Sequence, residues 1–293
     1  MKHHKALKLL KKLKLPGSSL SGVYSTPAID DTDGDGLMEF AFGSFDRNIY
    51  LFREKLNGKL AIDFGLHAAD TVWSSPAFFD ADGDGIKEMF IGTDISANKF
   101  LQPPTTNGGY VYSIKTTPPV DSNGKKIKKF GFRDSKIVNW QTTSDQVVFS
   151  SPVLADVLSN SGTELIIQTG CFFKNSKGTY TGNNIKILNS KTGKVLRTIE
   201  IERCSQSQPA IGDIDGDGKL DIVVSVNGSD SPGQIEAYDP DTGSKKWSTE
   251  VSIKDVGFAS PVIADLDQNG SPEIIASVAV SYTHLTLPTN REV

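Results

Sequence analysis

Acidic side chains recur with one spacing at four places in this chain of 293 residues. The segments are DTDGDGLME (31–39), DADGDGIKE (80–88), DIDGDGKLD (213–221) and DLDQNGSPE (265–273). Each places oxygen-bearing side chains at positions 1, 3, 5 and 9 and a glycine at position 6. Carboxylates this close together repel one another, and a bound divalent cation removes that repulsion. The spacing therefore predicts four loops that each hold a metal ion through oxygen ligands.

Calcium suits these loops best, because it accepts about six to eight oxygen ligands in a flexible geometry. Magnesium demands a tighter octahedron and is the second choice. An EF-hand is excluded, since that motif needs a bidentate glutamate at position 12. Position 12 here is Phe42, Ile91, Val224 or Ala276. Ordinary Asp-Gly turns are the alternative for a single loop, but recurrence of the same spacing favours metal.

The acidic loops lie inside a repeated unit of about fifty residues. Each unit begins near a proline, and these prolines are Pro27, Pro76, Pro152, Pro209 and Pro261. In the fourth unit the runs PAIGD, LDIVVSV, IEAYD and KKWSTEV predict four short strands joined by turns, and no helical periodicity persists. A period of this length with four strands is typical of a β-propeller. The expected fold class is therefore all-β.

The expected domain is a propeller of four-stranded blades over residues 21–280, with four complete units and a partial fifth. We expect an incomplete ring from a longer propeller of about seven blades. The alternative is a closed five-bladed ring, in which residues 7–15 supply an outer strand. Residues 1–20 are a basic segment that can form the outer strand of a preceding blade, and residues 281–293 match no unit and indicate a non-native tail. An insertion at residues 103–129 is expected at the rim or on the face opposite the acidic loops.

The short acidic loop between two strands resembles the calcium loops of FG-GAP/VCBS repeats, which occur in the N-terminal propellers of integrin α-subunits and in many secreted bacterial proteins. The resemblance covers roughly residues 25–280. It implies four calcium sites with side-chain ligands at positions 1, 3, 5 and 9 and a backbone carbonyl at position 7. The implied ligands are Asp31, Asp33, Asp35, Leu37 and Glu39; Asp80, Asp82, Asp84, Ile86 and Glu88; Asp213, Asp215, Asp217, Lys219 and Asp221; and Asp265, Asp267, Asn269, Ser271 and Glu273.

The third unit departs from the pattern. Its segment DVLSNSGTE (156–164) places Leu158 at position 3 and Ser161 at position 6, although it keeps Asp156 and Glu164. A leucine cannot ligate calcium, and the tight turn lacks its glycine. We therefore predict that the third loop holds no calcium and that hydrogen bonds alone hold its turn.

Other candidate chemistry is sparse. The tract AYDPDTGSKKW resembles blade ends of quinoprotein-like propellers, in which Trp247 would pack in the core, but the vicinal cysteine pair of the quinone dehydrogenases is absent. Cys171 and Cys204 are predicted on one face of the propeller, where a disulfide and two free thiols are both compatible with the sequence. No histidine has a partner repeated between units, and no nucleophile motif occurs, so the protein is expected not to be an enzyme.

The formal net charge of −4 is too small to indicate a nucleic-acid partner, and no apolar run is long enough for a membrane span. The resemblance implies a secreted or cell-surface adhesion or binding module with structural calcium, located outside the cell, at its surface or in the periplasm. A protein or glycan ligand would bind the face opposite the calcium loops. The alternatives are an accessory propeller of a carbohydrate-active enzyme, such as a polysaccharide lyase, and a quinoprotein-like assembly scaffold.

Overall fold

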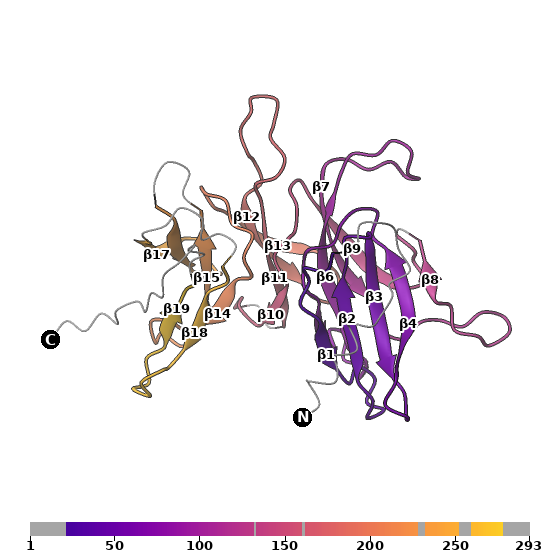
Figure 1. The fold of residues 1–293 in the computed structure, drawn as a ribbon. Coiled ribbons are helices and arrows are strands. Elements are labelled where there is room, and N and C mark those ends of the chain that lie inside the picture. The colour runs from indigo at the N-terminus through magenta and orange to yellow at the C-terminus, as the bar shows by residue number, and fades with distance from the viewer. Residues whose placement is uncertain (1–21, 132, 160–161, 228–231, 252–258, 278–293) are drawn as a thin grey trace.

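The structure is a computed structural model that describes residues 22–131, 133–159, 162–227, 232–251 and 259–277 (Figure 1). All regular elements in these ranges are β-strands. The first unit contains β1 (Ala28–Asp30), β2 (Glu39–Gly43), β3 (Asn48–Glu54) and β4 (Leu60–His67). The second contains β5 (Ala77–Phe79), β6 (Glu88–Ile95), β7 (Gly108–Ile114) and β9 (Val138–Ser144).

The remaining units repeat this order. The third contains β10 (Val153–Ala155), β11 (Glu164–Thr169), β12 (Asn184–Asn189) and β13 (Val195–Glu200). The fourth contains β14 (Ala210–Gly212), β15 (Asp221–Val226), β16 (Gln234–Tyr238) and β17 (Lys245–Glu250), and the fifth contains β18 (Val262–Ala264) and β19 (Glu273–Ile275). Each unit is a separate antiparallel sheet, and the first strands of successive units contact one another. This is the arrangement of β-propeller blades, with four complete units and a partial fifth as predicted. The expectations for residues 1–20 and 281–293 lie outside the described residues.

The hydrophobic core lies between neighbouring sheets. The second strands β2, β6, β11 and β15 consist entirely of buried residues. Successive side chains of a strand point to opposite faces of the sheet. In β6, Met89 and Ile91 accordingly pack into the core shared with the first unit, whereas Phe90 packs into the core shared with the third. Each second strand is therefore apolar on both faces, which explains its continuous apolar sequence.

One glycine of β6 is required by this close packing. A Cβ atom at Gly92 would lie 2.7 Å from the backbone carbonyl oxygen of Val148, which belongs to the connection into the third unit. The backbone of that connection can approach the sheet only because Gly92 carries no side chain.

Alternating strand direction places the loops on two faces. Loops between the first and second strands, which carry the acidic segments, lie at one end of every sheet. Loops between the second and third strands, and the connections between units, lie at the other end, here called the opposite face. Figure 1 shows the long β6–β7 and β11–β12 loops together on the upper side, away from the β18–β19 loop.

The insertion of the second unit lies partly on the opposite face and partly at the rim. Residues 98–105 belong to the β6–β7 loop, where Asn98 and Thr105 form an isolated bridge. Further along the chain, β8 (Lys129–Phe130) adds a parallel strand to the outer edge of β4 (Figure 1). The side chain of Phe130 packs edge-on against Phe64 in the core of the first unit. Both expected positions of the insertion are therefore correct for different parts of it.

Candidate metal sites

The four acidic loops share one backbone scaffold. In the first loop, Asp31 accepts hydrogen bonds from the backbone N–H groups of Gly34 and Gly36, at 2.8 and 2.9 Å. Asp80 and Asp213 accept the corresponding bonds, and Asp265 accepts bonds from positions 5 and 6 of its own loop. Position 1 therefore fixes the turn, and the N–H groups that Asp80 accepts, foremost that of Gly85, lower the pKa of its carboxyl.

The scaffold requires left-handed backbone at positions 4 and 6. Gly34 and Gly36 have φ angles of 74° and 81°, and the same two positions of the loops at residues 80–88 and 213–221 are also glycines with positive φ. In the last loop, position 4 is Gln268, which adopts a φ of 59°. A side chain in this region costs about 1–2 kcal/mol. The DGDG sequence is therefore explained by its backbone as well as by its carboxylates.

Position 9 joins each loop to the second strand. The Glu39 Oε2 atom accepts the N–H of Thr32 at 2.9 Å and its hydroxyl at 2.7 Å. Glu88 and Glu273 accept the N–H of position 2 in the same way. Burial raises the pKa of the carboxyl groups at position 9 in the first four units, which are Glu39, Glu88, Glu164 and Asp221.

Most of the predicted side-chain ligands converge. In each of the four loops, three carboxylates present oxygen atoms that all lie within 4.8 Å of one another. The groups are Asp31, Asp33 and Glu39; Asp80, Asp82 and Glu88; Asp213, Asp215 and Asp217; and Asp265, Asp267 and Glu273.

The other predicted ligands are placed differently. Asp35 and Asp84 lie outside the convergent groups, and each accepts the N–H of position 7 instead. Asn269 accepts the same bond in the last loop. Asp221 also lies outside its group. The predicted carbonyl ligands Leu37, Ile86, Lys219 and Ser271 stay predictions.

The first loop contains buried carboxylate oxygens that lack a hydrogen-bond partner. Asp33 Oδ1 and Glu39 Oε1 are buried and accept no hydrogen bond, and the Glu39 side chain is fully buried. Both residues belong to the convergent group. Buried oxygens without a hydrogen-bond partner destabilise a fold, and a hard cation coordinated by them would remove that penalty. The donor set of the first loop therefore fits calcium.

The first loop also contains a cation of its own. The Arg53 Nη1 atom, from β3, lies 2.8 Å from Asp33, 3.3 Å from Asp35 and 3.0 Å from Glu39 Oε1. The contact with Glu39 is close enough for an ion pair but is not aligned as a hydrogen bond. Arg53 Nε lies 3.1 Å from Asp63 of β4. Burial alone would lower the pKa of Arg53, but these acids, Glu39 foremost, raise it overall. The guanidinium therefore stays charged inside the loop.

The fourth unit carries an internal cation in a different strand. Lys246 Nζ lies 2.6 Å from Asp215 and 2.9 Å from Asp221. The lysine lowers the pKa of Asp215. In the pairing of the last two strands, Asp63 of the first unit and Lys246 of the fourth are both the extra residue of a β-bulge. One bulge position thus carries an acid in the first unit and the cation itself in the fourth.

The second loop has no such cation. Within the described ranges, no lysine or arginine side chain forms an ion pair with Asp80, Asp82, Asp84 or Glu88. Lys115 takes the strand position that Arg53 takes in the first unit, because Ile114 pairs with Met89, but Lys115 is exposed. Lys191 of the third unit reaches only the backbone carbonyl of Asp82, at 3.5 Å.

The third loop is held by hydrogen bonds, as far as it is described. Glu164 accepts the N–H groups of Val157 and Leu158 at 2.9 and 3.3 Å. Ser159 donates both its N–H and its hydroxyl to Asp241, which lies in the β16–β17 turn of the fourth unit. No convergent acidic group is present here among the described residues, which omit Asn160 and Ser161.

Sequence reasoning missed the internal cations and the role of Asp241. It also placed Trp247 in the core, whereas Trp247 is 36% exposed. Trp140 occupies the same position in the second unit and donates its indole N–H to the carbonyl of Ser190 in the next unit. Ser190 lies in the turn between the third and fourth strands of the third unit. The described residues of the fifth unit include no such turn on which Trp247 could pack. Aligning the strands of the units with one another would have shown that Arg53, Lys246 and Trp247 hold structurally defined positions.

The cysteine alternatives are resolved in favour of a disulfide. Cys171 and Cys204 are bonded, with their Cα atoms 5.4 Å apart. The bond joins the β11–β12 loop to the connection between the third and fourth units, both on the opposite face.

In the part of the chain that the structure describes, no helix has the length and apolar character of a membrane span.

Comparison with known families finds a similarity for two segments of the chain. The family model of the FG-GAP-like repeat matches residues 31–91 and 213–276. These two segments are similar to FG-GAP-like repeats. The matched segments contain all four acidic loops and leave out the third loop, which lacks the acid pattern. No curated protein is significantly similar to the chain.

The solved structures that this chain resembles share little sequence with it. Sqt1 of Saccharomyces cerevisiae is 14% identical with a TM-score of 0.50, over 82% of this chain and 53% of that protein. The Dos1 propeller is 12% identical with a TM-score of 0.46, over 88% and 60% of the two chains. A europium-containing methanol dehydrogenase is 11% identical with a TM-score of 0.48, over 88% and 49%. The chain spans about half the length of Sqt1, and that likeness shows the fold alone.

Proposed function

We propose that the protein is a calcium-stabilised β-propeller that acts as a non-catalytic binding or adhesion module outside the cytoplasm. The acidic loops would hold structural calcium on one face, and a ligand would bind the opposite face. The observation that carries the calcium proposal is the convergence of three carboxylates in each of the four loops, among them Asp33, whose buried Oδ1 atom accepts no hydrogen bond. The repeat family supports it, because the resemblance implies calcium at these positions.

The role of calcium in this proposal is structural. When bound, the ion supplies positive charge and ordered coordination to the loop. The chain's own residues do the rest: the carboxylate at position 1 fixes the turn through backbone N–H groups, and the carboxylate at position 9 ties the turn to the second strand. Neutralising these carboxylates would stabilise the ends of the innermost strands, which contact one another around the centre of the propeller.

The disulfide supports residence outside the cytoplasm, because disulfides persist in oxidising compartments and are rare in reducing ones. Its position on the opposite face also favours a binding role for that face. Loops that are held in one conformation lose less entropy when a ligand binds.

The experiment is thermal unfolding of the whole chain with calcium, with magnesium and with excess EGTA. At about 100 times its dissociation constant, an ion adds roughly 2.7 kcal/mol per site. We expect calcium to raise the melting temperature by several degrees more than magnesium does. Equal melting temperatures in calcium and EGTA would contradict the proposal.

A matched pair of variants assigns the effect to the loops. Asp82→Asn alters position 3 of the second loop, and Asp156→Asn alters position 1 of the third loop, which lacks the acid pattern. We expect Asp82→Asn to reduce the stabilisation by calcium and Asp156→Asn to leave it unchanged. A reduction by both variants, or by neither, would mean that calcium acts elsewhere.

A further inference from the structure

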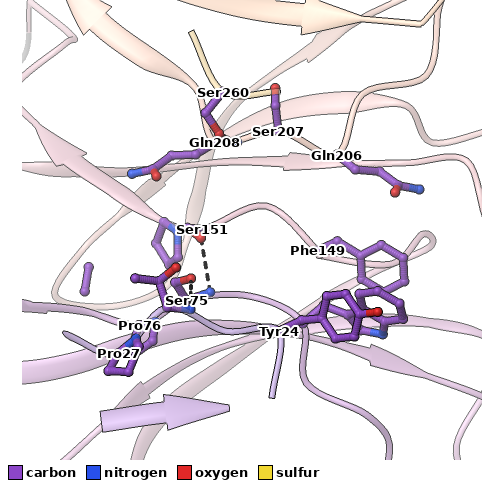
Figure 2. A pocket seen from close by; sticks show the side chains of 14 residues that line it. Tyr24, Pro27, Ser75, Pro76, Phe149, Ser151, Gln206, Ser207, Gln208 and Ser260 are labelled. Carbon is purple, nitrogen blue, oxygen red and sulfur yellow. Dashed lines mark hydrogen bonds between the residues drawn. The ribbon is translucent and has the colours of Figure 1, made fainter. Parts of the chain in front are cut away.

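A cavity of about 640 Å³ opens where the segments leading into the first strands meet. Its walls come from all five units (Figure 2). They include parts of the tetrapeptides YSTP (24–27), WSSP (73–76) and FSSP (149–152), together with residues 206–208 and Ser260. The repeated element is a hydroxyl-rich segment that ends in proline and, in these first three units, begins with an aromatic residue.

Hydroxyl groups in this element join neighbouring units. Ser75 Oγ accepts the N–H of Thr26 at 2.8 Å, and Ser151 Oγ accepts the N–H of Ser75 at 3.1 Å. Ser260 Oγ accepts the N–H of Gln208 at 3.0 Å. Each of these hydroxyls accepts a bond and donates none to another described residue, so its own hydrogen can be offered to a ligand. The cavity wall therefore presents serine hydroxyls from several units.

Six aromatic rings form a continuous row beside the cavity. The aromatic row consists of Tyr24, Phe45, Trp73, Phe149, Phe172 and Phe173. Ring centroids are 5.0 Å apart between Tyr24 and Trp73, and 4.9 Å apart between Trp73 and Phe149. Tyr24 is 69% exposed and Phe172 is 55% exposed. Large exposed rings that adjoin one another mark a binding surface more often than scattered ones do.

The row is held rigidly. Gln146 Oε1 accepts the N–H groups of Phe172 and Phe173 at 3.0 and 3.1 Å, and Gln146 Nε2 donates to the carbonyl of Phe173 at 2.6 Å. The Cys171–Cys204 disulfide fixes the same loop. Trp73 donates its indole N–H to Thr71 Oγ1 at 3.2 Å. A surface fixed in this way binds without first being ordered.

The chemistry of the walls selects the ligand. Among the described residues that line the cavity, none carries an ionisable acid or base other than the phenol of Tyr24. The nearby carboxyl groups of Asp70 and Asp94 do not line it. An uncharged wall of serine hydroxyls and glutamine amides pairs with neutral donors and acceptors, and aromatic faces pack against C–H groups. Sugars without charged groups present both features.

We propose that this cavity and the aromatic row bind a neutral oligosaccharide. The proposal rests on the proposed function of the opposite face as a binding surface and adds the chemical class of the ligand. The rings would stack on the faces of the sugar rings, while Ser75, Ser151 and Gln208 would hydrogen-bond their hydroxyl groups.

The test is isothermal titration of the whole chain with five neutral hexasaccharides: cello-, laminari-, malto-, manno- and chitohexaose. We expect at least one to bind with a dissociation constant between micromolar and millimolar. Tyr24→Ala and Trp73→Ala should each weaken that binding by about tenfold or more, which corresponds to about 1.4 kcal/mol. Tyr24 is exposed, so its removal does not threaten the fold. Trp247→Ala, far along the outer strand β17, is the matched control and should leave binding unchanged.

Each other outcome overturns the proposal. It fails if none of the hexasaccharides binds at millimolar concentration to protein that melts cooperatively, or if Tyr24→Ala and Trp73→Ala both bind normally. Preferential binding of an acidic oligosaccharide, such as hexagalacturonate, or of a peptide library would assign the cavity to another class. Melting curves in calcium and EGTA on the same samples separate the two proposals. Stabilisation by calcium without sugar binding overturns only the saccharide site, whereas sugar binding without stabilisation overturns only the calcium proposal.

Discussion

The first and second acidic loops have the same turn but different neutralising groups. In both, the aspartate at position 1 accepts the N–H groups of positions 4 and 6. In the first loop the guanidinium of Arg53 lies among the carboxylates, whereas no described cationic side chain pairs with those of the second. A loop with an internal cation is partly neutral before any metal binds. Nearly identical motifs on one propeller are therefore expected to depend on calcium to different degrees.

Removal of the internal cation is expected to have the largest effect. Arg53→Met leaves Asp33 and Glu39 without the guanidinium, whereas Asp63 keeps Lys126 at 3.2 Å. Breaking a buried ion pair from one side costs about 3–5 kcal/mol. We expect a loss of this size in the free energy of unfolding in EGTA, measured with urea. Calcium should restore much of it, because an ion can then replace the guanidinium.

Lys115→Met is the control for this change, since Lys115 holds the same strand position in the second unit and is exposed. It should alter stability by no more than about 0.5 kcal/mol. Equal losses of stability for Arg53→Met in calcium and in EGTA would show that calcium does not replace the guanidinium of Arg53.

A buried carboxyl at the far end of β6 tests what a charge without a paired cation costs. The pKa of Asp94 is raised from 3.8 to about 7, mainly by burial. Asp70 also raises this pKa, whereas the hydrogen bond from Thr71 and the charge of Arg47 lower it. The folded state therefore holds this proton more tightly than the unfolded state does. Its stabilising contribution is complete below about pH 4 and is lost as the pH rises through 7.

Asp94→Asn should not show this loss, because an amide does not ionise and can still accept the hydroxyl of Thr71. The variant should gain on the order of 3 kcal/mol relative to the natural protein between about pH 4 and pH 8, measured by urea unfolding in EGTA. Parallel pH profiles for the two proteins would show that Asp94 carries no such penalty.

Neutralising the carboxylate at position 9 should change the stability of the fold in opposite directions in the first and second loops. Glu39→Gln removes a charge that lies 3.0 Å from Arg53, whereas Glu88→Gln removes a buried charge that has no cationic partner among the described residues. In EGTA we expect Glu39→Gln to destabilise the fold and Glu88→Gln to stabilise it, each by roughly 1 kcal/mol. Both should reduce the response to calcium. Changes of the same sign in EGTA would make the two loops electrostatically equivalent.

The smallest expected effect concerns the backbone. Gln268 adopts positive φ at position 4 of the last loop, where the second loop has Gly83. Gln268→Gly should stabilise by about 0.5–1 kcal/mol, and the reciprocal Gly83→Gln should destabilise by a similar amount. No atom lies within 4 Å of a Cβ built at Gly83, so crowding does not confound the second change. Thermal unfolding in EGTA measures both, and a loss from Gln268→Gly would argue against backbone strain.

The sequence was sufficient for the blades and for the loops between their first two strands. The second strands are buried on both faces and so carry continuous apolar runs such as DIVVSV, while Asp-Gly repeats mark the turns. The placement of both cysteines on one face followed from the alternating strand direction alone. These features depend on neighbouring residues and on a repeated order of strands, which a single sequence contains.

The internal cations depend on contacts that the sequence does not display. Arg53 reaches Glu39 because the two residues face each other across β2 and β3, and Lys246 reaches Asp221 from a β-bulge two strands away. Such positions are known only once the register is known. The aromatic row likewise arises from several units at once, although the aromatic residue three positions before Pro27, Pro76 and Pro152 gave a repeated signal.

The most direct test is a calcium titration of the whole chain by isothermal calorimetry, repeated on Asp33→Asn and Asp82→Asn. We expect up to four bound ions in at least two classes, with the second loop, which has no internal cation among the described residues, in the tighter class. Asp82→Asn should remove a tight site, and Asp33→Asn should affect only the weaker class. Identical sites, or tight sites that survive Asp82→Asn, would contradict the division between loops, and no measurable binding would contradict the calcium proposal itself.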